Sequence, residues 1–115
     1  MVCAAELRGL GAEADARRLA PGSIVAISTD DDERLDAWRA SMSKAFTFVS
    51  DPGKAAIGAW GLVHPGAAPG GKDAARPATY VLRRGGVVAW AHPAESVLDR
   101  PEPAEVLDAL AAAAR

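Results

Sequence analysis

One short apolar run, Ser23–Ser28 (Ser-Ile-Val-Ala-Ile-Ser), restricts the fold most strongly because it lies between two stretches with helical spacing. Its β-branched residues predict a buried strand. The preceding helix is predicted over Glu6–Ala20, since Pro21 and the glycine after it end the periodic pattern. The next helix is predicted to begin in the acidic segment Asp30–Glu33, which suits the positive end of a helix dipole. Helix, strand and helix in this order predict an α/β fold.

The second half of the chain adds a hairpin and a closing helix. Two β-branched runs, Thr79–Leu82 and Val87–Trp90, are separated by Arg-Arg-Gly-Gly and predict a β-hairpin. The closing helix is predicted over Ala104–Ala114. The connecting region is predicted to hold an extended segment, a short helix and a loop, at Phe46–Val49, Lys54–Leu62 and His64–Ala75. With 115 residues and no internal repeat, we expect a single domain over 1–115.

Composition argues against several classes of function. The formal net charge is −2 with acidic and basic residues interspersed, so we expect no binding to nucleic acid or to an anionic membrane. No apolar run is long enough to span a bilayer, and the first residues lack the pattern of a secretory signal. A single cysteine excludes a disulfide within the chain and a thiolate-rich zinc site. We therefore expect a cytoplasmic protein with no cofactor and no metal.

Several partial motifs have ordinary explanations. Gly66–Lys72 has the spacing of a phosphate-binding loop, but Asp73 replaces the serine or threonine that would bind magnesium, so we reject nucleotide binding. His64 and His92 lack a carboxylate or cysteine at metal-ligand spacing. No serine lies in the context of a nucleophile elbow. The tryptophans are expected to form core or cleft walls, at Trp38, Trp60 and Trp90.

Cys3 is the only cysteine, and it lies beside the start of the first predicted helix. Unsatisfied backbone N–H groups and the positive end of the dipole favour a thiolate at such a position. Position alone also fits a terminal cysteine without a role, and Glu6 alone fits an ordinary first-turn acid.

Four segments, in their order and spacing, resemble a peroxiredoxin-like protein of the alkyl hydroperoxide reductase/thiol-specific antioxidant group. They are Cys3–Leu7, Ser50–Pro52, Arg76–Val81 and Gly86–Trp90. The ending, Asp-Arg-Pro at 99–101 followed by Glu-Val-Leu at 105–107, is also similar to bacterial members. The resemblance covers nearly the whole chain.

The resemblance implies a thioredoxin-like fold, a mixed sheet flanked by helices. Because at most Met1-Val2 precede Cys3, it also implies that the first strand is missing. Three explanations stay open: the natural product begins upstream, the chain is a degenerate fragment, or another subunit supplies the strand.

By the same resemblance, the protein would be a thiol peroxidase that reduces hydrogen peroxide or alkyl hydroperoxides through a sulfenic acid on Cys3. Arg76 would stabilise the thiolate and polarise the peroxide, although it lies one residue further from the strand than in the family pattern. Glu6 would hold the local network. Pro77 falls at the position of the cis-proline of thioredoxin-like proteins.

Because the chain has a single cysteine, the sulfenic acid would have to be reduced by a thiol of another molecule. The reductant would be a thioredoxin-like protein or a low-molecular-weight thiol, or Cys3 of a second subunit in a homodimer. The family's proline and threonine upstream of the cysteine have no counterpart here. The alternative is therefore a non-catalytic thioredoxin-fold interaction module or a redox-sensing remnant, with Cys3 exposed.

Overall fold

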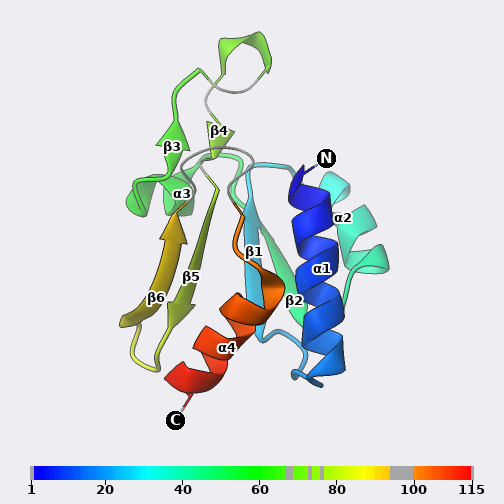
Figure 1. The fold of residues 1–115 in the computed structure, drawn as a ribbon. Helices are drawn as coiled ribbons and strands as arrows, with labels where there is room; N and C mark the ends of the chain where they lie inside the picture. The colour runs from blue at the N-terminus through cyan, green and yellow to red at the C-terminus, as the bar shows by residue number, and fades with distance from the viewer. Residues whose placement is uncertain (1, 67–68, 73, 76, 94–99, 115) are drawn as a thin grey trace. The chain divides into compact units, whose positions relative to one another are not determined.

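The computed structural model describes residues 2–66, 69–72, 74–75, 77–93 and 100–114 (Figure 1). Its helices are α1 (Val2–Ala16), α2 (Asp32–Ser41), α3 (Ala55–Ala59) and α4 (Pro103–Ala113), with a 3-10 turn at Pro69–Gly71. Its strands are β1 (Ile24–Ser28), β2 (Phe46–Ser50), β3 (Val63–His64), β4 (Ala74–Ala75), β5 (Ala78–Leu82) and β6 (Val88–Pro93). The chain forms two compact units, residues 1–18 with 77–115 and residues 19–76. The single domain over 1–115 stays a prediction.

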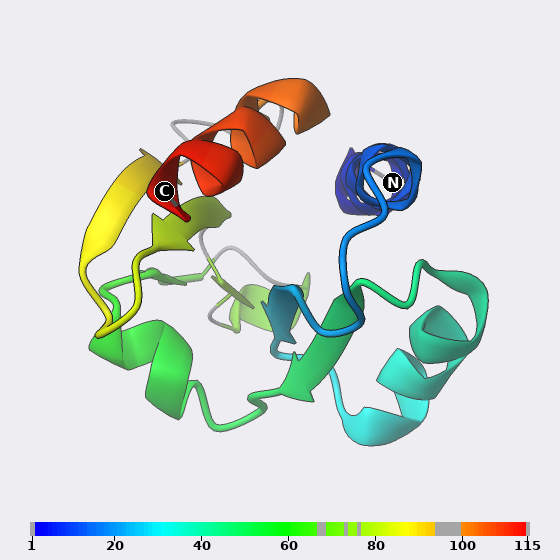
Figure 2. The ribbon, with the colours of Figure 1, turned by 90° about the horizontal axis from the view of Figure 1, so that it is seen from below.

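The unit of residues 19–76 is built on a parallel pair of strands. β1 and β2 run side by side, in register from Ile24 opposite Phe46 to Ser28 opposite Ser50 (Figure 2). The connection between them contains α2, whose start was predicted from its acidic residues. Asp31 is the N-cap, and its side chain accepts a hydrogen bond from the backbone N–H of Arg34 at 3.0 Å. This bond satisfies one of the free N–H groups of the first turn.

The core of this unit is aromatic and lies between α2 and β2. Phe46 and Phe48 alternate with exposed Thr47, so both rings lie on one face of β2 and are buried with Leu35 of α2. The rings of Trp38 and Phe48 meet edge to face with centroids 6.2 Å apart. β1 departs from the prediction of a buried strand, because its residues alternate between half-buried and exposed. Its Val25 is 58% exposed, because α2 packs against the opposite face of the strand pair.

The second unit combines the hairpin with both terminal helices. β5 and β6 are antiparallel, which confirms the predicted hairpin, and Gly85 and Gly86 in the turn both have positive φ. α1 and α4 lie against each other (Figure 1). A Cβ added at Gly9 would lie 3.4 Å from Pro103 Cγ, which is van der Waals distance, so Pro103 at the start of α4 packs directly over Gly9. The core of this unit includes the buried side chains of Leu10, Ala14, Val81, Val106 and Leu107.

Several predicted boundaries were wrong by a few residues. α1 spans Val2–Ala16 and not Glu6–Ala20, and it ends as Arg18 adopts the left-handed conformation with φ 56°. The loop over His64–Ala75 contains a two-residue antiparallel pair, β3 with β4. Trp60, predicted to be a core or cleft residue, is 43% exposed, because α3 ends at Ala59 and the ring lies beyond the helix.

Candidate functional site

Cys3 lies in the first turn of α1, because the helix begins at Val2. The first N–H groups of a helix have no partner within it, so this is a position that favours a thiolate. Glu6 follows three residues later and therefore lies on the same side of α1, one turn further on. The side chain of Cys3 lies outside the described residues, as do Arg76 and the bond that joins it to Pro77. Contact between Cys3 and Arg76 stays a prediction.

The structure places Arg100 beside Glu6. Arg100 Nε lies 2.8 Å from Glu6 Oε2, and the two side chains are only 12% and 21% exposed. Arg100 comes from the segment that precedes α4, and buried Pro101 follows it. An ion pair with this little exposure costs desolvation energy, and removal of one partner leaves the other charge enclosed without compensation. The pair therefore holds the Glu6 side chain, one turn from Cys3, to the segment that precedes α4.

Burial and charge oppose each other at Glu6. Burial raises the pKa of the Glu6 carboxyl above its ordinary value of 4.5, while the positive charges of Arg100 and His92 act to lower it. The net direction is upward, so the desolvation effect is the larger one. His92 belongs to β6 and stacks on Trp90 with ring centroids 6.1 Å apart. The site thus joins α1, β6 and the segment before α4.

Of the predicted site residues, the structure gives Glu6 a charged partner, and that partner was not among the predictions. Arg100 was noted only within the Asp-Arg-Pro sequence at 99–101, without a role. An arginine between an acidic residue and a proline, just before a helix, is a weak signal on its own. Only the packing of α1 against α4 brings it to Glu6.

The raised pKa of Glu6 predicts a dependence of stability on pH. The folded state holds this proton more tightly than the unfolded state, so the contribution is fully present below about pH 4.5 and is lost as pH rises through the folded pKa. We expect Glu6→Gln to remove the part of the fall in unfolding free energy with rising pH that comes from Glu6. Urea unfolding at a series of pH values from 4 to 7 would measure it, with Glu105→Gln on the exposed side of α4 as the matched control. Equal pH profiles for wild type and Glu6→Gln would contradict the prediction.

Within the described residues, helices and three two-stranded sheets form a mixed α/β protein with a cysteine in the first turn of a helix, which is consistent with a thioredoxin-like fold. Residues 1–91 match the family model described as AhpC/TSA family. This match covers most of the chain, so the protein belongs to the AhpC/TSA family. Membership of this family supports a function of the redoxin or peroxidase type. No curated protein matches the chain. Within the described residues, no helix is both long and apolar enough to cross a membrane.

Proposed function

We propose that the protein is a one-cysteine thiol peroxidase that reduces hydrogen peroxide or alkyl hydroperoxides at Cys3. The observation that carries the proposal is the half-buried Glu6–Arg100 ion pair, one helical turn from a cysteine in the first turn of α1. Because the two side chains have so little solvent exposure, the pair holds Glu6 in one position near the N-terminal end of α1. Family membership supports the type of chemistry.

In the first step, the Cys3 thiolate attacks the terminal oxygen of the hydroperoxide. An S–O bond forms, the O–O bond breaks, and the leaving alkoxide takes a proton to become the alcohol, or water when the substrate is hydrogen peroxide. Sulfur is oxidised to the sulfenic acid and the peroxide is reduced. Arg76 is proposed to donate charge-assisted hydrogen bonds to the thiolate and to the peroxide oxygens.

In the second step, an external thiol reduces the sulfenic acid. Its sulfur forms a disulfide with Cys3 and releases water, and a second thiol then displaces Cys3 as the thiolate. A thioredoxin-like protein or a low-molecular-weight thiol would fit this role in the cytoplasm, where thiols are kept reduced. In a homodimer, Cys3 of the second subunit would serve in the same way.

The experiment that tests the proposal is the rate of Cys3 oxidation by hydrogen peroxide in the purified chain, followed by intact mass to detect the sulfenic acid. We expect a rate several orders of magnitude above that of a free thiol. A rate equal to that of a free thiol would contradict the proposal and would favour the non-catalytic interaction module or redox-sensing remnant.

A second prediction concerns Arg100. Because it acts through Glu6, Arg100→Met should slow Cys3 oxidation by roughly ten- to a hundredfold, the scale of small displacements at a reacting group. The control is Arg17→Met, which removes ion pairs to Glu13 and to Asp108 near the other end of α1. Comparing the pH profiles of the two variants separates a positioning effect from a loss of stability, because only Arg100 is expected to shift the profile. Equal oxidation rates in both variants would show that the Glu6–Arg100 pair has no part in the chemistry.

A further inference from the structure

The turn of the β5–β6 hairpin combines exposed aliphatic side chains with unpaired positive charge. Leu82, Val87 and Val88 are 45%, 63% and 46% exposed. Arg83 and Arg84 between them are exposed, and their guanidinium groups make no ion pair or hydrogen bond with any residue that the structure describes. No acidic residue occurs between Asp73 and Glu95 in the sequence. Clustered exposed aliphatic groups of this kind usually mark a contact surface.

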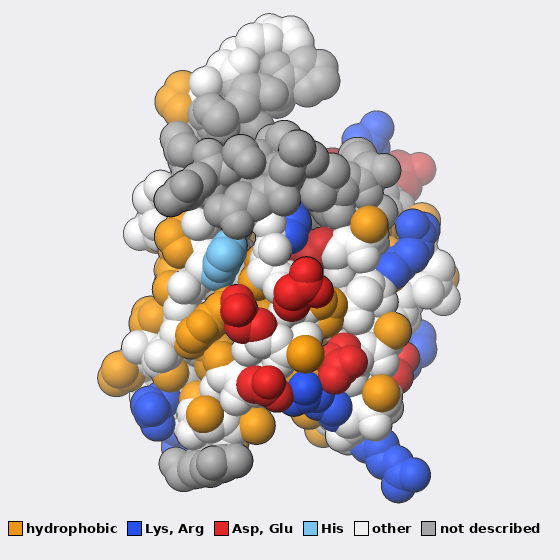
Figure 3. Space-filling model, viewed as in Figure 1, with side chains coloured by type: hydrophobic (Ala, Val, Ile, Leu, Met, Phe, Trp, Pro, Cys, Tyr) orange, Lys and Arg blue, Asp and Glu red, His pale blue; other side chains and the backbone are white. Residues whose placement is uncertain are grey.

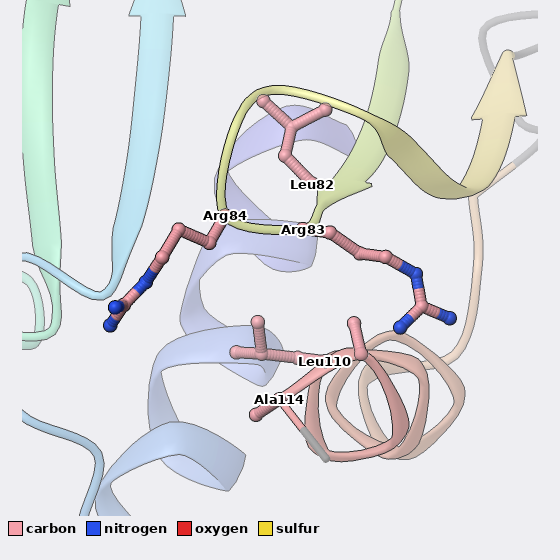
Figure 4. Close-up of a pocket in the computed structure, with 6 residues that line it drawn as sticks. Leu82, Arg83, Arg84, Leu110 and Ala114 are labelled. Atoms are coloured by element: carbon pink, nitrogen blue, oxygen red, sulfur yellow. The ribbon is translucent and has the colours of Figure 1, made fainter.

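This turn borders a groove with a volume of about 520 Å³, formed with the last turns of α4. Its lining residues are Leu82, Arg83, Arg84, Leu110, Ala113 and Ala114. Figure 4 shows the two arginines leaving the turn in opposite directions, with Leu110 facing the hairpin from α4. The α4 side of the groove is therefore aliphatic, whereas the side chain of Leu82 points away from Leu110, and a guanidinium group extends from either side of the turn.

The charge around the groove selects the kind of ligand. Acidic side chains gather around α4 (Figure 3), but those of the helix itself, Glu105 and Asp108, precede its last turn, and Asp108 is paired with Arg17. The end of α4 contributes a partial negative charge of about half a unit, whereas the two arginines contribute two full positive charges. Positive charge therefore dominates at the mouth of the groove. The aliphatic α4 side of the groove favours a hydrocarbon chain.

We propose that this groove binds a single-chain aliphatic carboxylate. The hydrocarbon chain would lie on Leu110, Ala113 and Ala114, where it loses contact with water. The carboxylate would accept hydrogen bonds from the guanidinium group of Arg83 or Arg84, in the geometry that arginine and carboxylate groups favour. The proposal does not depend on the chemistry of Cys3, because all lining residues lie in the hairpin and in α4.

The test is calorimetric titration of the full chain with decanoate below its micelle concentration, together with methyl NMR shifts of Leu110, Ala113 and Ala114. We expect saturable binding that shifts these methyl groups. Hexanoate should bind at least about tenfold more weakly, since each fully buried CH₂ is worth about a factor of four. Decyltrimethylammonium, with the same chain length and the opposite charge, should not bind.

The variants test the role of charge. Arg83→Gln with Arg84→Gln should weaken decanoate binding by roughly tenfold, since each exposed charge contact is worth about a factor of two to five. The control is Arg8→Gln with Arg18→Gln, which removes two other exposed charges and should leave the affinity unchanged. Equal binding of decanoate and decyltrimethylammonium, or an unchanged affinity in the Arg83/Arg84 variant, would overturn the proposal. So would binding to phosphatidylglycerol vesicles, dependent on these arginines, without any binding of free decanoate.

Discussion

Replacement of Cys3 by serine is expected to abolish turnover of hydroperoxide, with a loss of about 10³-fold or more, the scale on which removal of a nucleophile acts. Cys3 is the only thiol in the chain, so no other side chain can form a sulfenic acid in its place. Serine keeps the size and the helical position of the side chain. Its hydroxyl is not ionised near neutral pH and is a far weaker nucleophile than a thiolate.

Steady-state consumption of hydrogen peroxide in the presence of a dithiol reductant would measure this loss. The matched control is Ser23→Ala, a serine in the other compact unit, which should leave the rate unchanged. Unfolding curves for wild type and Cys3→Ser should coincide, so that a change of rate reports chemistry and not folding. Peroxide consumption that survives in Cys3→Ser would end the proposal of a one-cysteine peroxidase.

Replacement of Phe48 by alanine is expected to lower the free energy of unfolding by about 3–4 kcal/mol. Phe48 is only 6% exposed, and its ring packs against both Trp38 and Phe46, with centroids 6.2 and 5.4 Å away. The variant loses the transfer energy of the ring, the aromatic contacts and the packing around the cavity that remains. This is a large share of the stability of a small domain.

Urea unfolding monitored by circular dichroism would measure the effect. Thr47→Ala is the matched control, because Thr47 is the exposed neighbour on β2 and its replacement should cost less than about 1 kcal/mol. Similar losses for both variants would show that the aromatic cluster is not the core of the unit of residues 19–76.

The sequence predicted correctly those helix ends and turns that depend only on neighbouring residues. The start of α2 follows from Asp31 and the acidic residues after it, since an N-cap needs only the next few N–H groups. The hairpin follows from Gly85 and Gly86, which adopt positive φ without steric cost. The end of α1 was predicted less well, because a pattern of apolar residues does not show where a residue such as Arg18 turns left-handed.

Some features of the candidate site also follow from local sequence, and others depend on tertiary packing. The single thiol, its place at the start of a helix and Glu6 one turn later all follow from the sequence, because helical periodicity depends only on local spacing. The pairing of Arg100 with Glu6 and the exposed face of β1 do not follow from it and appear only in the folded chain. Burial and ion pairing depend on which distant segments pack together, and no local pattern encodes that choice.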